Sequence, residues 1–335
     1  MREPAFWWRA AGLAAALLSP LAAIYGAVAA ARLRQRGARA GVPVICVGNF
    51  TVGGAGKTPA AIAVAQMLAA AGERPVFLSR GYGGTLSGVR VDPARHRAAD
   101  VGDEPLLLAR AAPVVVARDR VAGAQLAATE GASVIVMDDG FQNPSLAKDF
   151  SLLVVDARRG IGNGRVIPAG PLRAPLAAQL AHTDALLVIG SGSAADDVVK
   201  QASARALPAF AARLQPDARF LAALGGGRAL AFAGIGDPQK FFATLAEAGI
   251  ALGATRSFPD HHRYTRNEAQ ALCDEAGRAD LVLVTTEKDL ARMAGDDAAA
   301  SLAARALALP VTLAIEGVER FRSLVMERVG AARRR

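Results

Sequence analysis

The sequence predicts an α/β protein with a doubly wound parallel sheet, a smaller C-terminal α/β subdomain and an N-terminal membrane-associating helix. Two observations predict the sheet: short apolar runs alternate with segments of helical composition, and each run is apolar throughout. Such strands are buried on both faces, which is typical of a parallel sheet covered by helices. A third observation, an uncharged run near the N-terminus, predicts the membrane helix.

The N-terminal segment, residues 1–36, contains the uncharged run Ala10–Ala31, which is long enough to cross a bilayer as a helix. Its large apolar residues recur every three or four positions and are Leu13, Leu17, Leu21, Ile24 and Val28. This stripe fits a helix that lies in the membrane interface at least as well as it fits a helix that spans the bilayer. A helix packed on the protein's own core is a third alternative. Aromatic residues before the run and arginines after it would anchor at headgroups, and the arginines would place the rest of a spanning chain in the cytoplasm. The same arginines disfavour a cleaved signal peptide.

The following elements are expected in two domains. The core domain, residues 37–215, should contain strands at Val42–Val47, Pro75–Leu78, Pro113–Ala117, Val134–Met137, Leu152–Asp156 and Ala185–Ile189. Pro216 and the run Gly225-Gly226-Gly227 indicate a boundary. The subdomain, residues 216–335, should contain strands at Leu230–Ala233, Leu281–Thr285 and Val311–Ile315.

A phosphate-binding loop is the strongest local signal. An apolar strand is followed by a glycine-rich loop and then by Gly-Lys-Thr at the start of a helix. In such a P-loop the backbone N–H groups surround phosphates, Lys57 reaches the β- and γ-phosphates, and the Thr58 hydroxyl ligates Mg²⁺. A P-loop NTPase-like core that binds ATP is therefore predicted. The loop residues expected to bind nucleotide are Thr51, Val52, Gly53, Gly54, Ala55, Gly56, Lys57 and Thr58.

An acidic pair ends a second apolar strand, at Asp138 and Asp139. A carboxylate in this position of a P-loop protein supplies a ligand to the magnesium ion. Adjacent side chains on a strand point to opposite faces, so one aspartate should serve the metal and the other the chemistry. We assign Asp138 to the metal, with Thr58, and Asp139 to catalysis.

Composition narrows the function classes. With 335 residues, 52% of them hydrophobic, the chain supports a full core, which excludes disorder. The net charge of +9 favours anionic partners, such as an acidic membrane surface or a phosphorylated substrate. Nucleic acid is not expected as a partner, because aromatic residues make up only 5% and no stacking motif is present. Cys46 and Cys273 lack the spacing of a disulfide framework or a zinc site, which fits a reducing cytosolic setting.

The sequence resembles the tetraacyldisaccharide 4'-kinase family of lipid A biosynthesis. The resemblance covers most of the chain and rests on several motifs in the family's order. They are GNFTVGGAGKTP at 48–59, SRGYGG at 79–84, GDEP at 102–105, DDGFQ at 138–142, GIGNGRVIPAGPLR at 160–173, FPDHHRYT at 258–265 and TEKD at 286–289. The resemblance implies an ATP- and Mg²⁺-dependent kinase that phosphorylates the 4'-hydroxyl of an acylated glucosamine disaccharide 1-phosphate. It also implies a location at the cytoplasmic face of a Gram-negative inner membrane.

The resemblance also assigns site residues. Asp103 is implied as the general base that takes the proton of the sugar hydroxyl, and His261 as its partner. From the residues alone, Asp103 is equally a helix N-cap and His261 a lone surface or core histidine. Arg120, Gln142 and Arg173 are expected to bind substrate; arginine in particular matches phosphate bidentately.

One position departs from the family pattern. The family loop PAGPLR continues with an acidic residue associated with magnesium, whereas this chain has Ala174. Magnesium would then rely on Thr58, Asp138 and water, or on a substitute acid.

Other function classes remain as alternatives. A membrane-associated regulatory P-loop ATPase would carry a lysine where this chain has Val52. A GTPase would need Asn-Lys-x-Asp, whereas the lysine of Thr286-Glu287-Lys288-Asp289 comes one position late. The sequence identifies no protein partner, oligomeric state or acyl-chain preference.

Overall fold

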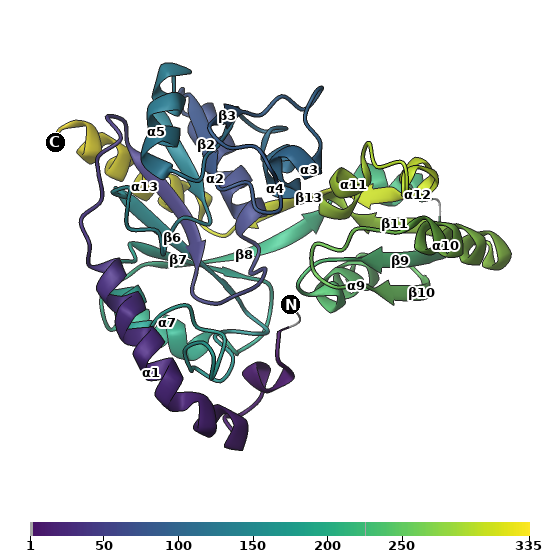
Figure 1. The fold of residues 1–335 in the computed structure, drawn as a ribbon, viewed down its shortest axis with the longest axis horizontal. Helices are drawn as coiled ribbons and strands as arrows, with labels where there is room; N and C mark the ends of the chain where they lie inside the picture. Colours follow the sequence, from purple (N-terminus) through teal and green to yellow (C-terminus); the bar gives the residue numbers. More distant parts are fainter. Residues whose placement is uncertain (1–2, 225) are drawn as a thin grey trace.

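The structure is a computed structural model that describes residues 3–224 and 226–335. Met1 and Arg2, at the start of the expected N-terminal segment, and Gly225, at the expected domain boundary, lie outside the described residues. The described part forms a large domain, a smaller domain beside it and an N-terminal helix along the large domain (Figure 1).

The large domain is built on a sheet that, within the described residues, has nine strands in the order β13-β8-β7-β6-β1-β5-β2-β4-β3. The inner pairs are parallel, whereas β3 and β13 run antiparallel to their neighbours at the two edges. The expected parallel sheet is confirmed at its centre, and the antiparallel edge strands are an addition. The strands are β1 (Val44–Asn49), β2 (Pro75–Ser79), β3 (Val89–Arg90), β4 (Val114–Val116), β5 (Val134–Asp138), β6 (Phe150–Asp156), β7 (Ala185–Ile189), β8 (Ala209–Pro216) and β13 (Val311–Ile315).

Helices cover both faces of this sheet, as a doubly wound fold requires. One face packs against α2 and α13 through residues such as Leu68 and Phe321, and the other packs against α5 and α7 through residues such as Ala127 and Val198. The bounds are α2 (Lys57–Ala70), α3 (Ala98–Val101), α4 (Asp103–Leu108), α5 (Arg120–Thr129), α6 (Leu176–Leu180), α7 (Asp196–Ser203) and α13 (Val318–Arg333).

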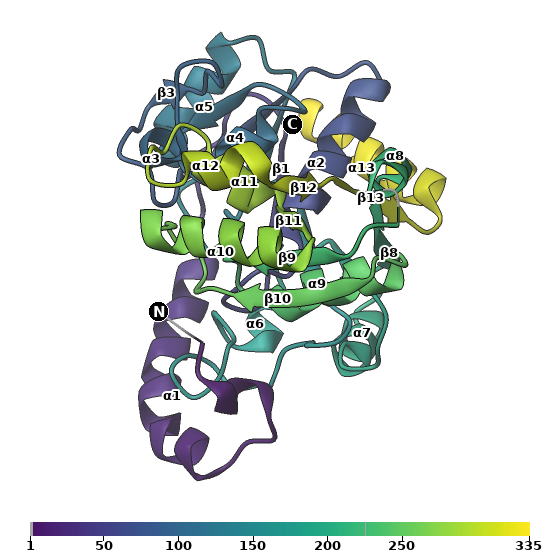
Figure 2. The ribbon, with the colours of Figure 1, turned by 90° about the vertical axis from the view of Figure 1, so that its right-hand side faces the viewer.

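The smaller domain has its own parallel sheet, in the order β10-β9-β11-β12 among the described residues. Its core contains Phe232 and Leu245, which are fully buried. Figure 2 shows α10 in front of this sheet, on the side away from the large domain. The elements are α8 (Ala218–Ala223), β9 (Ala229–Ala233), α9 (Pro238–Glu247), β10 (Leu252–Ser257), α10 (Arg266–Ala279), β11 (Val282–Thr286), α11 (Glu287–Met293), α12 (Ala300–Arg305) and β12 (Leu307–Leu309).

The end of the chain returns to the large domain. Val311–Ile315 pairs antiparallel with β8, and Phe321 on α13 is fully buried in the large core. The C-terminal end of the expected subdomain 216–335, from β13 onward, therefore belongs to the large domain and its sheet. Composition could not reveal this, because antiparallel pairing of strands about 100 residues apart leaves no local pattern.

Helix α1 (Leu13–Leu33) follows a short 3₁₀ helix, η1 (Ala5–Trp8), and turns its small residues toward the protein. Gly26 lies so close to Pro175 that an added Cβ would sit 3.4 Å from its ring. The large residues face outward: Leu13 is 77% and Leu17 71% exposed. The expected N-terminal apolar helix is therefore present, and it is long and apolar enough to cross a membrane.

Candidate functional site

The nucleotide loop connects β1 to α2 in the large domain. Gly53 and Gly56 adopt left-handed backbone angles, with φ of 94° and 92°, which other residues adopt only with strain. The loop closes on itself, because both Asn49 Nδ2 and Lys57 Nζ donate to the carbonyl of Gly53, at 3.0 and 3.3 Å. Residues 51–58 thus form one continuous turn at the N-terminus of α2, which is where the sequence predicts nucleotide binding.

The acidic pair follows β5. Asp138 is the last residue of the strand, and Asp139 leaves it with a φ of 50°, so the two carboxylates point to different partners. Asp138 is buried, and its Oδ1 has no hydrogen-bond partner among the described residues. Burial, with the nearby charges of Glu104 and Asp139, raises the pKa of Asp138 to about 7.

These groups fit a magnesium ion. An unpartnered buried carboxylate oxygen beside the P-loop is a group that a bound cation would satisfy. Thr58 is buried at the start of α2, as expected for the second ligand. Among the described residues, no three His, Cys, Asp or Glu side chains converge on one point. The donor set therefore suits Mg²⁺, which takes one or two protein ligands and completes its shell with phosphates and water.

Asp139 is held by two cations. Arg173 donates to both of its oxygens, at 2.7 and 3.1 Å, and Lys57 Nζ lies 3.6 Å from Oδ2. Burial raises the pKa of Asp139, but the charges of Lys57 and Arg173 outweigh burial and leave the pKa below its usual range. Asp139 is therefore a fixed anion that holds Lys57 at the mouth of the loop.

Arg173 and Gln142 belong to the same network. Arg173 Nε donates to the carbonyl of Thr51 at 2.9 Å, and Arg173 Nη1 donates to Gln142 Oε1 at 3.1 Å. Gln142 in turn donates to the carbonyl of Asn49. The structure thus places Arg173 and Gln142 behind the nucleotide loop, where they brace it.

Arg120 and Ala174 are the two remaining residues of the large domain that the sequence analysis singled out. Arg120 is 3% exposed and donates to the carbonyl of Ala117. Ala174 is fully buried, and its carbonyl accepts from Gln179. No carboxylate therefore occupies the position where the family loop carries one.

The predicted dyad comes from both domains. Asp103 begins α4 of the large domain and is 4% exposed, and His261 lies on the loop after β10 of the smaller domain. His261 Nδ1 is 3.2 Å from Asp103 Oδ2. Asp103 Oδ1 accepts from the backbone N–H of Glu104, while Gly102 holds the N-cap position of the helix.

The two groups shift each other's proton affinity. The hydrogen bond with Asp103 raises the pKa of His261, against the effect of burial. Burial raises the pKa of Asp103, but the hydrogen bond from His261 and the charges of Arg292 and Lys288 outweigh it, so the pKa is well below its usual range. The resting pair is therefore a carboxylate beside a histidine that gains a proton easily.

A cavity of about 320 Å³ opens beside the dyad, between the two domains. Asp103, His261 and Arg292 line it, together with the exposed ring of Tyr82 and two further arginines, Arg97 and Arg263. The loop after β9 lies between the segment that carries His261 and the nucleotide loop: a Cβ added to Gly236 would lie 3.4 Å from both Asp260 Oδ2 and Gly54 N.

Sequence reasoning missed two cations at the dyad, Lys288 and Arg292. Lys288 Nζ donates to Glu104 at 2.6 Å, and Arg292 contacts Asp103 itself. The motif at 286–289 was noted, but nothing local indicates that α11 docks against α4 of the other domain. Sequence reasoning missed Lys288 and Arg292 because they are far from Asp103 in sequence and only the fold brings them together.

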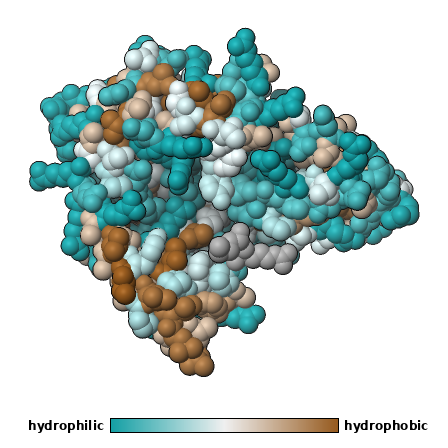
Figure 3. Space-filling view, in the orientation of Figure 1, coloured by the Kyte–Doolittle hydropathy of each residue, from teal (hydrophilic) through white to brown (hydrophobic). Residues whose placement is uncertain are grey.

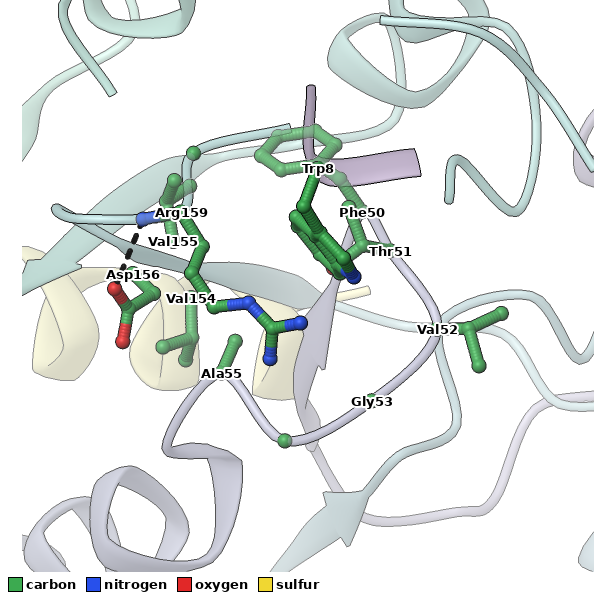
Figure 4. A pocket seen from close by; sticks show the side chains of 12 residues that line it. Trp8, Phe50, Thr51, Val52, Gly53, Ala55, Val154, Val155, Asp156 and Arg159 are labelled. Atoms are coloured by element: carbon green, nitrogen blue, oxygen red, sulfur yellow. Dashed lines mark hydrogen bonds between the residues drawn. The ribbon is translucent and has the colours of Figure 1, made fainter. Parts of the chain in front are cut away.

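The segment before α1 also reaches the nucleotide loop. Glu3 accepts from Trp8 Nε1 and from Arg159, and a Cβ added to Gly53 would meet Glu3 Oε1 at 2.1 Å. Figure 4 shows Trp8 and Arg159 next to each other among the residues that line a small pocket at the loop, and the Arg159 guanidinium lies 3.7 Å from the Trp8 ring centroid. Trp7 and Trp8, the tryptophans among the aromatic residues expected at lipid headgroups, contact the loop after β6: Trp8 packs on Arg159, and Trp7 donates to the carbonyl of Pro168.

Comparisons with known proteins agree with this geometry. Residues 14–330 match the family model described as tetraacyldisaccharide-1-P 4'-kinase. A tetraacyldisaccharide 4'-kinase of Rhodopseudomonas palustris strain BisB5 is 58% identical over 334 residues, covering 99% of this chain and 98% of the relative. The corresponding kinase of Bradyrhizobium strain BTAi1 is 57% identical and covers 100% of this chain and 97% of the relative.

The fold is similar to a solved structure. The crystal structure of LpxK from Aquifex aeolicus in complex with ATP superposes with a TM-score of 0.69 at 25% sequence identity. The match covers 94% of this chain and 99% of that one, and therefore includes both domains.

Proposed function

The chain belongs to the tetraacyldisaccharide 4'-kinase family, the kinases of lipid A biosynthesis. We propose that it transfers the phosphoryl group between its two domains, where Asp103 and His261 contact the acceptor hydroxyl. The observation that carries this proposal is the contact of Asp103 and His261 beside a cavity between the two domains. Gly236 of the smaller domain lies close to both Gly54 of the nucleotide loop and Asp260, the residue before His261.

ATP would bind with its phosphates along residues 51–58. The backbone N–H groups at the start of α2 face an anion there, and Lys57 has the reach to follow the β- and γ-phosphates. The ATP complex of the Aquifex aeolicus relative supports this assignment. Lys57 would exchange its contact with the carbonyl of Gly53 for the phosphates, while Asp139 keeps the ammonium group in place.

Magnesium would be held by Asp138 and Thr58. When bound, it neutralises charge on the phosphates of ATP. Asp138 has the free buried oxygen that such an ion requires. With Ala174 in this chain, the protein contributes no carboxylate from the loop after β6 at that position.

The proton of the acceptor hydroxyl would pass to the Asp103 and His261 pair. A general base must lie within hydrogen-bond reach of the hydroxyl, and within the described part of the chain Asp103 Oδ1 receives only the N–H of Glu104. His261 stabilises the pair by sharing the proton through Nδ1. The hydroxyl then attacks the γ-phosphorus in line, the bond to the ADP oxygen breaks, and no covalent enzyme intermediate is required.

Membrane attachment is proposed for the outer face of α1. Figure 3 shows a strongly hydrophobic strip over this helix, in contrast to the mostly hydrophilic surface of the smaller domain. The strip contains Leu13, Leu17, Leu21, Ile24 and Val28, all more than half exposed. We propose that this face inserts into the cytoplasmic side of the inner membrane, where the lipid acceptor is held.

Label transfer tests the activity. Wild-type protein in detergent is incubated with γ-³²P-ATP, Mg²⁺ and tetraacyldisaccharide 1-phosphate, and the lipid is separated. Labelled lipid is expected, and it should be nearly abolished by Asp103→Ala. ATP hydrolysis without labelled lipid would instead support the regulatory ATPase.

A paired substitution tests the membrane proposal. Leu17→Ser with Leu21→Ser should reduce binding to anionic phospholipid vesicles and transfer to lipid in vesicles, but leave transfer in detergent unchanged. The control is Leu307→Ser, because Leu307 is a 42% exposed leucine of the smaller domain. Equal losses in vesicles and detergent would overturn the proposal.

A further inference from the structure

The guanidinium of Arg292 lies at the junction of the two domains. Arg292 is in α11 of the smaller domain, and its side chain is only 7% exposed. A buried arginine must find partners for its N–H groups, and the identity of these partners shows what it holds in place.

One set of partners fixes the segment that carries His261. Arg292 Nη1 donates to the carbonyls of Gly234 and His262, each at 3.2 Å. The Gly234 carbonyl also accepts the N–H of His261 at 3.0 Å. His261 has a φ of 56°, a left-handed conformation that needs support from its surroundings. Arg292 therefore holds two carbonyls next to this strained residue: that of Gly234, which accepts the His261 N–H, and that of His262, the following residue.

The other partner is Asp103 of the large domain. Arg292 Nε and Nη2 both donate to Asp103 Oδ2, at 3.2 and 2.5 Å. The same oxygen faces His261 Nδ1 at 3.2 Å. Oδ2 is thus fully engaged, and Oδ1, which receives one backbone N–H, is the oxygen left for a further donor.

We propose that Arg292 is the positioning residue of the dyad, which aligns the His261 loop with Asp103 across the domain junction and directs Asp103 Oδ1 toward the acceptor hydroxyl. This inference rests on the proposed role of Asp103. Arg292 acts through Asp103 and His261, because its Nε, Nη1 and Nη2 each donate to acceptors of the protein.

Buried polar groups hold Arg292 itself. Arg292 Nη1 donates to Asp289 Oδ1 at 2.8 Å, and Asp289 is fully buried. Asp289 also accepts from the N–H of Gly234 and the hydroxyl of Tyr264. The guanidinium therefore has one orientation, because the carboxylate behind it is fixed by groups of the smaller domain.

The charge of Arg292 also affects protonation of the dyad. The charged or titratable groups nearest the pair include the potential cations His261, Arg292 and Lys288 and the carboxyl groups of Glu104, Asp260 and Asp289. Arg97, Arg263, Asp296 and Asp297 line the same cavity. Removing one cation from this set raises the pKa of Asp103. As the pH falls, activity that requires the Asp103 carboxylate should then be lost at a higher pH than in the wild type.

The test compares Arg292→Gln and Arg292→Lys with Arg110→Gln. Arg110 pairs with Glu287 at 2.8 Å, so its substitution breaks another contact of α11 with the large domain but leaves Asp103 untouched. Each protein is assayed for label transfer from ATP to tetraacyldisaccharide 1-phosphate between pH 5 and pH 9, with ATP affinity and thermal unfolding measured in parallel.

Arg292→Gln should lower kcat about 100-fold, because misplacing a catalytic group by about 1 Å has this effect. ATP affinity should stay unchanged, and the acid limb of the kcat profile should move to higher pH. Arg292→Lys should restore the position of the acid limb but only part of kcat, because lysine keeps the charge and loses the planar fork. Arg110→Gln should match wild type in kcat and in its profile.

Two results would overturn the inference. One is an unshifted acid limb in folded Arg292→Gln; the other is an equal loss of kcat in Arg110→Gln. Failure of the proposed function gives a different result, because Asp103→Asn would then retain transfer whatever the behaviour of the Arg292 variants.

Discussion

Contacts inside the nucleotide loop join residues four positions apart, whereas the contacts that assemble the dyad join residues 158 and 189 positions apart. The loop lies between two neighbouring elements, β1 and α2, and the residues that brace it, Arg173 and Gln142, belong to the same domain. The dyad exists only where α4 of the large domain meets the smaller domain. The difference implies that nucleotide binding survives changes that separate the domains, while transfer does not.

The largest effect is expected from Asp103→Asn. The substitution keeps the shape of the side chain and removes its charge and basicity, so kcat should fall about 10³-fold. ATP affinity, measured by calorimetry, should stay at the wild-type value because the nucleotide loop is untouched. A parallel loss of ATP affinity would contradict the independence of the nucleotide loop from the dyad.

Lys57→Ala should affect both binding and transfer. Removing one cation from a phosphate site lowers kcat by about 10²- to 10³-fold, and here it also leaves Asp139 with one cation less. ATP affinity should weaken as well, in contrast to Asp103→Asn. The pKa of His261, followed by NMR, serves as the control and should not change; a change would show that the loop and the dyad are coupled.

Stability changes in the two cores provide a second contrast. Leu245→Ala in the smaller domain and Leu187→Ala in the large sheet each empty a fully buried position. Each should lower the free energy of unfolding by about 2–5 kcal/mol. At a temperature where only the smaller domain of the Leu245 variant opens, transfer should be lost while ATP binding persists. Loss of both activities together in that variant would contradict a loop that folds within the large domain.

The pKa of His261 offers the finest test. Its hydrogen bond with Asp103 raises this pKa, so Asp103→Asn should lower it in an NMR titration. Because the folded-state pKa is raised, this contact stabilises the fold fully below the unfolded pKa of about 6.5, and the stabilisation is lost as pH rises through the folded value. An unchanged pKa in the variant would show that the two side chains do not share a proton in solution.

The same contrast explains what the sequence could predict. The central strands and the nucleotide loop were predictable, because burial on both faces and the Gly-Lys-Thr turn are local patterns. Strand β8 was not, because only alternate residues in much of it are buried, and β13 was assigned to the wrong sheet because its partner lies far away in sequence. His261 came only from the family resemblance. Arg292 had no local signal at all, since its role depends on how α11 docks against α4.

The central claim is that one proton-accepting unit is assembled across the two domains. A double-mutant cycle measures it directly, with kcat for label transfer determined for wild type, Asp103→Asn, His261→Gln and the double variant. The account predicts that the double variant is scarcely slower than the more damaged single variant, because either change disables the same unit. Losses that multiply would show two independent groups and would contradict it.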